Sequence, residues 1–88
     1  MGIVDIKNEL REMRNLNRRY ITNELSIKYR DIFSKLPPLE EKVMIECYIN
    51  GKSYSACGSK IAYCERQVKR IVQRSIKAIN DIIKEREL

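Results

Sequence analysis

Apolar residues at helical spacing, with very few proline or glycine interruptions, constrain this chain more than any other feature. After Gly2, the only prolines and glycines are Pro37, Pro38, Gly51 and Gly58. Between these positions apolar side chains recur every three or four residues, which is the period of an α-helix and not the alternation of a β-strand. The sequence therefore predicts an all-α fold.

The first apolar stripe predicts one long N-terminal helix. Its members are Ile3, Ile6, Leu10, Met13, Leu16 and Tyr20, continued on a rotated stripe by Ile21, Leu25, Tyr29 and Ile32. We expect a helix of about 25–30 residues within segment 1–35, bent or broken near Asn15–Asn23. Such a helix either folds across its own domain or serves as a dimerisation or docking element, since heptad-like spacing would suit a second copy.

A second helix is predicted to begin at Pro37-Pro38. Proline is tolerated in the first helical turn, and Glu40-Glu41 place acidic groups near the positive end of the helix dipole. Asn50-Gly51 predicts the end of this helix, with glycine in a left-handed cap. Its apolar face consists of Leu39, Val43, Met44, Cys47 and Tyr48.

Two further helices are predicted after this cap. Ser53 is a favourable N-cap for a short helix over residues 54–61, and another helix begins near Glu65. Gly58 is expected where these two helices cross, since a residue without a side chain lets the backbones approach. The buried side of the last helix is expected to hold Val68, Ile71, Val72, Ile76, Ile79 and Ile83.

The basic charge is concentrated in the C-terminal part of the chain. The 88 residues contain 18 Lys/Arg and 12 Asp/Glu, for a net charge of +6. Residues 1–50 carry nine basic and eight acidic side chains, whereas residues 51–88 carry nine basic and four acidic ones. A basic excess in one segment favours a polyanionic partner, and DNA is the first expectation.

Composition excludes several classes of function. The chain has no histidine, so the commonest general base and metal ligand is absent. Cys47, Cys57 and Cys64 are spaced ten and seven residues apart, which is neither a metal clip nor a paired disulfide framework. We expect no enzymatic activity, no cofactor and no bound metal. Free thiols and the absence of a long apolar run predict a cytoplasmic protein with no membrane partner.

The C-terminal part has the organisation of a DNA-reading unit. Two helices joined by a tight turn, the second basic on its outer face, present side chains to the major groove. Residues 36–80 resemble the helix-turn-helix of sigma factor region 4 in three stretches, LPPLEEKVM (36–44), YINGKSY (48–54) and ERQVKRI (65–71). The resemblance implies that 36–88 is a helix-turn-helix DNA-binding domain with an extended C-terminal recognition helix.

The run from Arg66 to Ile76 is similar to phage late-gene activators of the ArpU/RinA type. Three positions depart from the sigma-like pattern. Gly58 replaces the usual alanine, Ala62 replaces the usual turn glycine, and Cys64 stands where a serine normally caps the recognition helix. A non-glycine residue in a left-handed turn costs roughly 1 kcal/mol, so a somewhat different turn is expected at Ala62.

The resemblance and the outward positions on the last helix together predict the DNA contacts. Arginine reads guanine, glutamine reads adenine, and lysine suits phosphates. The residues expected to read base edges are Glu65, Arg66, Gln67, Lys69, Arg70 and Gln73. Those expected to contact phosphates are Ser53, Lys60, Arg74 and Lys77. Tyr54 and Tyr63 are expected either to contact phosphates through their hydroxyls or to pack in the core.

The sequence thus predicts a sequence-specific DNA-binding transcription regulator of phage or prophage type. We expect a homodimer that binds double-stranded DNA, with RNA polymerase as a further contact. Two alternatives remain open. One is the DNA-recognition (small) subunit of a phage packaging terminase, which also combines a helix-turn-helix with a helical oligomerisation segment. The other is an adaptor that binds polymerase or a sigma factor without touching DNA.

Overall fold

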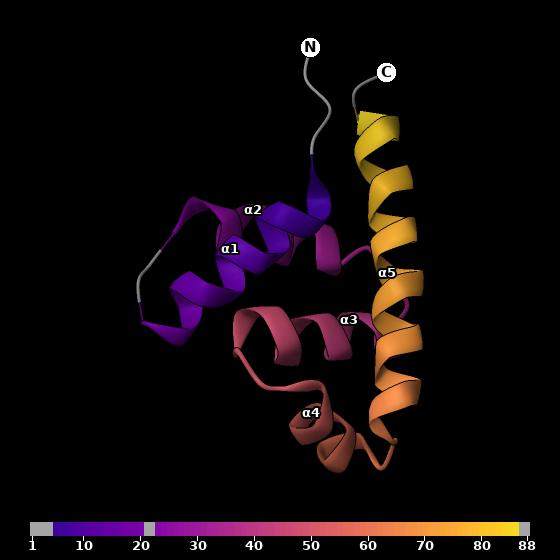
Figure 1. The fold of residues 1–88 in the computed structure, drawn as a ribbon. Helices are drawn as coiled ribbons and strands as arrows, with labels where there is room; N and C mark the ends of the chain where they lie inside the picture. Colours follow the sequence, from indigo (N-terminus) through magenta and orange to yellow (C-terminus); the bar gives the residue numbers. More distant parts are fainter. Residues whose placement is uncertain (1–4, 21–22, 87–88) are drawn as a thin grey trace.

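The computed structural model describes residues 5–20 and 23–86, and every regular element in these ranges is helical (Figure 1). The elements are α1 (Ile6–Arg18), α2 (Glu24–Phe33), α3 (Pro38–Met44), a π-helical stretch η1 (Ile45–Ile49) that continues α3, α4 (Tyr54–Ile61) and α5 (Glu65–Arg86). The prediction of an all-α fold is confirmed. The 22 residues of α5 span about 33 Å, close to the 39 Å length of the whole molecule.

The helix of about 25–30 residues predicted for segment 1–35 is divided into two separate helices, α1 and α2, so its predicted length is wrong and the predicted break is present. Tyr20 lies in the left-handed region with a φ of 58°, which ends the first helix. The Asn23 side chain then caps α2 by accepting a hydrogen bond from the Ser26 N–H at 2.9 Å. Asn17 Oδ1 accepts hydrogen bonds from Asn23 Nδ2 at 3.1 Å and from the Ser26 hydroxyl at 3.0 Å. The break falls in the window that the sequence indicated.

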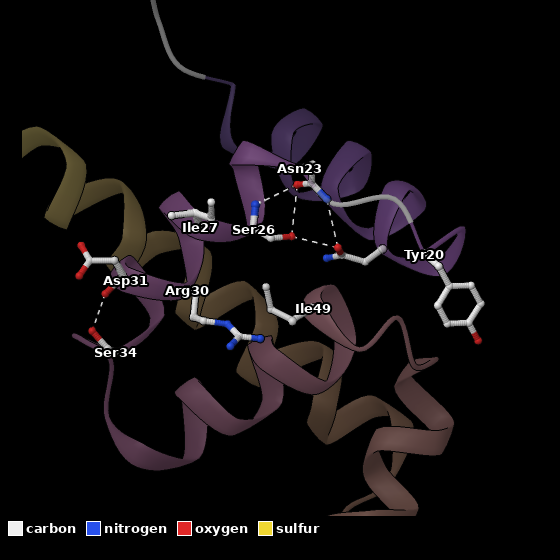
Figure 2. Close-up of a pocket in the computed structure, with 9 residues that line it drawn as sticks. Tyr20, Asn23, Ser26, Ile27, Arg30, Asp31, Ser34 and Ile49 are labelled. Atoms are coloured by element: carbon white, nitrogen blue, oxygen red, sulfur yellow. Dashed lines mark hydrogen bonds between the residues drawn. The ribbon is translucent and has the colours of Figure 1, made fainter.

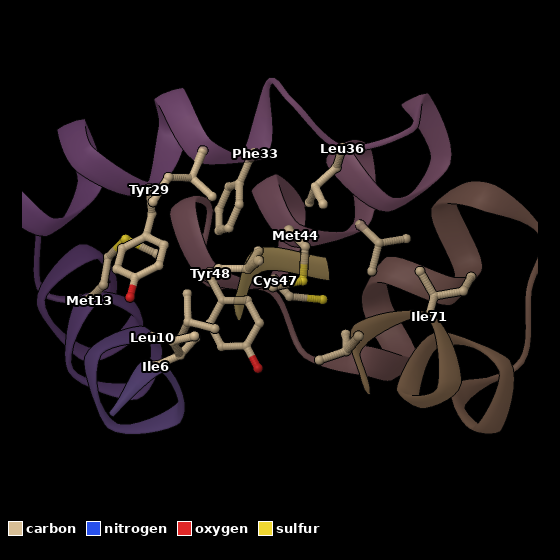
Figure 3. Close-up of a cluster of buried hydrophobic side chains, with 14 of the residues drawn as sticks. Ile6, Leu10, Met13, Tyr29, Phe33, Leu36, Met44, Cys47, Tyr48 and Ile71 are labelled. Carbon is tan, nitrogen blue, oxygen red and sulfur yellow. The ribbon is translucent and has the colours of Figure 1, made fainter. Parts of the chain in front are cut away.

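One hydrophobic core joins all the helices, and α3 with η1 lies at its centre. Val43, Met44 and Cys47 are fully buried there, and α1, α2, α4 and α5 all pack around this segment. Figure 3 shows part of the core, whose other buried apolar residues are Ile6, Leu10, Met13, Tyr29, Ile32, Phe33, Leu36, Tyr48, Cys57, Val68, Ile71, Val72 and Ile79.

Most of the apolar stripe of the N-terminal segment packs within the chain, whereas Tyr20 at its end is exposed. Leu10 and Met13 of α1 and Ile32 of α2 are each at most 1% exposed, so these side chains are not available to a second copy. Ile3 and Ile21, which the sequence placed on the same stripe, lie outside the described residues. The described part of the segment therefore folds across its own domain, which was one of the two alternatives that the sequence left open.

Polar side chains of α1 satisfy the carbonyl groups at the end of η1. Arg14 Nε donates to the Cys47 carbonyl at 3.2 Å, and Asn17 Nδ2 donates to the Tyr48 carbonyl at 3.0 Å. Carbonyls at a helix end have no partner within the helix, so these bonds tie α1 to η1. Gly51, with a φ of +72°, then reverses the chain and confirms the predicted left-handed cap.

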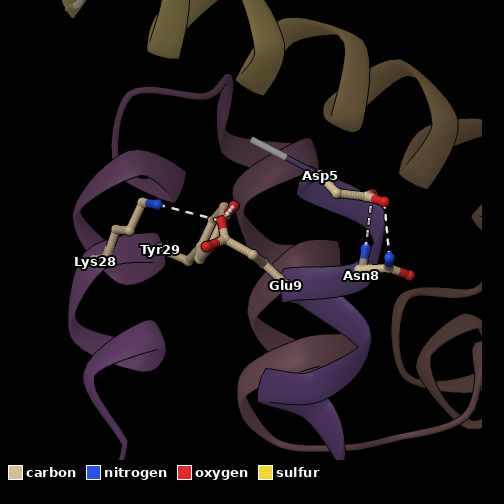
Figure 4. A network of polar contacts seen from close by, with 5 residues as sticks. All are labelled: Asp5, Asn8, Glu9, Lys28 and Tyr29. Carbon is tan, nitrogen blue, oxygen red and sulfur yellow. Dashed lines mark hydrogen bonds and ion pairs between the residues drawn. The ribbon is translucent and has the colours of Figure 1, made fainter. Parts of the chain in front are cut away.

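A buried tyrosine and a carboxylate join α1 to α2 (Figure 4). Asp5 caps α1 by accepting from the Asn8 N–H at 3.1 Å. One turn later Glu9 Oε1 accepts from the Tyr29 hydroxyl at 2.5 Å and lies 3.2 Å from Lys28 Nζ. Burial and the neighbouring carboxylate raise the pKa of Tyr29 above its ordinary range. Tyr29 therefore stays a neutral donor that holds the two helices together.

The connection from α4 to α5 is a tight turn with two special positions. The Ser53 hydroxyl accepts from the Ala56 N–H at 3.0 Å, which confirms the predicted cap of α4. Ala62 ends that helix in a left-handed conformation with φ 63° and ψ 38°. The Tyr63 N–H then donates to the Gly58 carbonyl at 2.8 Å, and a Cβ on Gly58 would collide with the Tyr63 carbonyl. Gly58 thus permits the close approach that the sequence suggested.

Replacement of Gly58 by alanine is expected to destabilise the protein by about 2–3 kcal/mol, because the added Cβ meets backbone that cannot rotate away. Urea unfolding followed by circular dichroism measures the change. Ser59→Ala, at the exposed neighbouring position of α4, is the control and should stay within about 0.5 kcal/mol of the wild type. Equal stability of the two variants would contradict the close contact.

Replacement of Ala62 by glycine is expected to raise the free energy of unfolding by about 0.5–1 kcal/mol, since glycine removes the left-handed strain. The same change at Ala56, a right-handed position within α4, should lower it by about 0.5–1 kcal/mol. Thermal unfolding of both variants gives the two signs. A destabilised Ala62→Gly variant would show that the turn carries no strain.

Candidate nucleic-acid interface

The outer face of α5 carries a row of exposed polar and basic side chains. The buried residues Val68, Ile71, Val72, Ser75 and Ile79 fix which face of the helix points inward. Successive residues are rotated by about 100°, so the opposite face is determined as well. Its exposed members are Arg66, Lys69, Arg70, Gln73 and Lys77, and the structure brings these five predicted DNA contacts together.

Two of the predicted base-reading residues lie off this outer face. The Gln67 side-chain carbonyl accepts from the Cys64 N–H at 2.9 Å, which caps the start of α5. Gln67 lines a shallow hollow with Leu39 of α3, which Arg70 borders from the edge of the outer face. The helical rotation places Gln67 nearer to α3 than Arg70. Glu65 is exposed in the first turn, where a carboxylate interacts favourably with the helix dipole. Both side chains have a role in starting the helix.

Lys60, a predicted phosphate contact, forms an ion pair within the chain. Its Nζ lies 2.8 Å from Oε2 of Glu46, a residue only 5% exposed in the centre of the fold. Lys52 Nζ lies 3.6 Å from the same oxygen, and Asn50 Nδ2 donates to Glu46 Oε1 at 2.6 Å. The ion pair with Lys60, together with Asn50 and Lys52, lowers the pKa of Glu46 despite burial, which acts in the opposite direction.

The remaining predicted phosphate contacts differ in what surrounds them. Arg74 Nε lies 3.7 Å from Glu40 Oε1 of α3, while the Arg74 side chain is 65% exposed. The Ser53 hydroxyl accepts the capping bond of α4, which leaves its own hydrogen free to be donated outward. Lys77 is exposed on the outer face of α5 and has no ion pair within the described residues. The four residues therefore occupy the ends and flanks of the α4–α5 pair.

The sequence interpretation missed a basic flank on α1. Its four bases follow each other in steps of four, three and four residues, at Lys7, Arg11, Arg14 and Arg18. This spacing places all four on one side of the helix, while Asp5, Glu9 and Glu12 fall on the other. The near-neutral net charge of residues 1–50 concealed this separation of bases from acids. The helical spacing of the four bases could have revealed it.

This basic flank forms one wall of a groove against α5. The groove has a volume of about 350 Å³ and is lined by Lys7, Arg11 and Arg14 from α1 and by Lys69 and Gln73 from α5. Tyr48 and Tyr54, whose hydroxyl oxygens lie 3.2 Å apart, also line the groove, and we call this pair its floor. Tyr54 therefore packs with the core and also borders the groove, so both of its expected roles remain compatible with its position.

A larger hollow of about 770 Å³ lies on another part of the surface, beside α2 and η1 (Figure 2). Tyr20 and Ile27 border it with exposed fractions of 96% and 72%, and Ile49 contributes a further apolar side chain. No residue of α5 lines this hollow. It is thus separate from the basic surface.

Comparison with protein-family models, with curated proteins and with solved structures gives no match for this chain. The functional argument therefore depends on the side chains themselves. None of the helices in ranges 5–20 and 23–86 is long and apolar enough to cross a membrane. Those ranges also contain no cluster of three or more Cys, Asp or Glu side chains placed to hold a metal ion.

Glu46 is expected to make stability depend on pH. Its pKa is lower in the folded chain than the value of about 4.3 typical of an unfolded one, so its contribution is present above that value and is lost as pH falls through the folded pKa. Glu46→Gln should therefore reduce the loss of unfolding free energy between neutral and acidic pH. Urea titrations at pH 7 and pH 3 measure this loss.

The control for this experiment is Glu12→Gln, the same change at an exposed carboxylate of α1 that has no ion pair in the described part of the chain. That variant should keep the wild-type loss of stability. An equal loss in the Glu46 variant and in the wild type would contradict a role for the Glu46–Lys60 pair.

Proposed function

We propose that this protein is a sequence-specific DNA-binding transcription regulator of phage or prophage type, with α4 and α5 acting as a sigma region 4-like helix-turn-helix. The supporting observation is the outer face of α5, on which five predicted DNA contacts lie exposed and without ion pairs in the described residues. An ordinary solvated face would be expected to mix acids with these bases. Between Arg66 and Lys77 the face has none.

The dimensions of α5 suit the major groove. A helix with its side chains is about 10–12 Å wide, and the major groove of B-DNA is about 12 Å wide. The row from Arg66 to Lys77 is about 16 Å long, which corresponds to roughly five base-pair steps. The N-terminal half of α5 lies next to α4 at one end of the molecule (Figure 1), and its outer face is exposed.

The side chains on this face have the chemistry of base reading. The guanidinium groups of Arg66 and Arg70 suit the two acceptors of guanine, and the amide of Gln73 suits adenine. Lys69 adds a further donor for guanine or for the backbone. In this arrangement Glu65 and Gln67 lie at the edge of the base-reading row, because both side chains already interact with the first turn of α5.

Phosphate contacts would come from both ends of the α4–α5 pair. Ser53 and Lys77 are free to donate to phosphate oxygens, whereas Lys60 and Arg74 must exchange a carboxylate partner for a phosphate. The Arg74 side chain is 65% exposed, and exposed ion pairs contribute little to stability, so this exchange costs little for Arg74. For Lys60 the exchange costs more, because the side chain of its partner Glu46 is only 6% exposed and would lose part of its compensating charge. We propose RNA polymerase as a further contact and a homodimer as the assembled form.

DNA binding is expected to depend on salt and on two arginines. With about five phosphate contacts, log K should fall with log salt at a slope near −4 to −5. Replacement of Arg66 or Arg70 by alanine should cost roughly 1–3 kcal/mol each and relax the base preference. Fluorescence anisotropy on a duplex selected from a random pool measures both effects.

The control for the arginine variants is Arg19→Ala/Arg30→Ala, which removes two exposed arginines at the α1–α2 side of the molecule. This variant should bind like the wild type. Absence of duplex binding, or binding that ignores salt, would contradict the proposal and favour a protein-binding adaptor. Light scattering on the same samples separates a regulator from a packaging subunit, because a large ring would favour packaging.

A further inference from the structure

The groove between α1 and α5 concentrates positive charge at a place where the chain provides no neutralising partner. Lys7, Arg11 and Arg14 approach from α1 and Lys69 from α5, and none of the residues that line the groove is acidic. Lys7 and Arg11 are exposed and make no ion pair or side-chain hydrogen bond within the described residues. The groove is thus lined by four cationic groups, and none of its lining residues provides a negative charge.

The position of Arg14 in this groove is fixed by contacts with backbone carbonyls. Its guanidinium donates to the Cys47 carbonyl at 3.2 Å and lies 3.5 Å from the Lys52 carbonyl, so its position is set by the backbone around the end of η1. A guanidinium has five N–H donors, and two such bonds leave the rest for a ligand. Among these cations Arg14 is therefore positioned before any ligand arrives.

The floor of the groove offers a neutral donor. Tyr48, which is 8% exposed, and Tyr54 have hydroxyl oxygens 3.2 Å apart, and one O–H is used between them. The second O–H has no acceptor among the described residues. Burial and the neighbouring hydroxyl raise the pKa of Tyr48 above its ordinary range, so the Tyr48 hydroxyl stays protonated. A free O–H beside four cations suits a phosphate oxygen.

The position of the groove relates it to the outer face of α5. Lys69 and Gln73 belong to both, so the groove lies along one flank of the helix that we propose to enter the major groove. A helix that fills a groove about 12 Å wide has a phosphate strand along each flank. The flank formed by α1 is therefore where one backbone strand of the same duplex would pass.

We propose that the groove lined by Lys7, Arg11, Arg14 and Lys69 is a second phosphate-binding surface, which holds the backbone of the duplex whose bases α5 reads. This inference rests on the proposed DNA binding and adds α1 to the interface. Helix α1 thereby contributes to affinity, in addition to its part in the core. Such contacts position the protein on the duplex and carry no base preference.

The test is the double substitution Lys7→Gln/Arg11→Gln in the full chain, with each single variant measured as well. Affinity for the selected duplex and for an unrelated one is measured by anisotropy over a range of salt concentrations. The slope of log K against log salt should become less negative by about 0.9 for each phosphate that the variant no longer neutralises. Affinity should fall by the same factor on both duplexes, because phosphates do not encode sequence.

The matched control is Arg30→Gln/Lys35→Gln, which removes two exposed charges that do not line the groove. It should keep the wild-type slope. A slope equal to that of this control in the Lys7/Arg11 variant overturns the inference, and the proposed function stands if the Arg66/Arg70 variant still loses affinity. If the wild type binds no duplex, the proposed function fails and the inference fails with it.

A second variant, Tyr48→Phe/Tyr54→Phe, tests the floor of the groove. Removal of both hydroxyls leaves no unpaired partner behind, so the fold should be nearly unaffected. We expect about three- to tenfold weaker binding with an unchanged salt slope, since a neutral hydrogen bond is lost and no charge. Unchanged affinity in this variant overturns the hydroxyl contact, and circular dichroism verifies that all the variants are folded.

Discussion

The structure depends on the burial of one short central segment, α3 with η1, from every side. Val43, Met44 and Cys47 are inaccessible to solvent, and the other helices of this 88-residue chain pack around them. This requirement brings α1 and α2 back over the segment on one side and α4 and α5 on the other. It also buries the Glu46 carboxylate, so Lys60 and Lys52 must supply the compensating charge. Packing at the centre thus determines which surface cations are already paired with a carboxylate.

The proposed interface uses the same helices that build the core. One face of α5 carries Val68 and Ile79 inward, and the opposite face carries Arg66 and Arg70 outward. The position of α1 is likewise set by apolar packing and by the bonds from Arg14 and Asn17 to η1. As a result its basic flank comes to lie beside α5. A rigid core therefore fixes the spacing between the base-reading row and the groove that we propose for phosphates.

Much of the fold could be predicted from local rules in the sequence. Helical period, the capping residue Ser53, the proline start of α3 and the glycine cap at Gly51 act over one or two turns, so their effects appear directly in the residues. The outward row on α5 follows from the same period. The sequence indicated a break near Asn15–Asn23 but not that the segment forms two separate helices, because the helical period resumes on a rotated stripe after Tyr20. Among the described residues, the left-handed Tyr20 and the cap at Asn23 mark the separation of the two helices.

By itself the sequence determined the helices, most of their ends, and the face of α5 that carries the bases, because these depend on residues close together in the chain. Tertiary structure alone decided which cations are free. Lys60 is paired with Glu46, and Arg74 is paired with Glu40. Lys7 and Arg11 line the same groove as Lys69, although more than fifty residues separate them from it in the sequence. Coulomb interactions depend on distance in space, and packing of the core around α3 and η1 sets those distances.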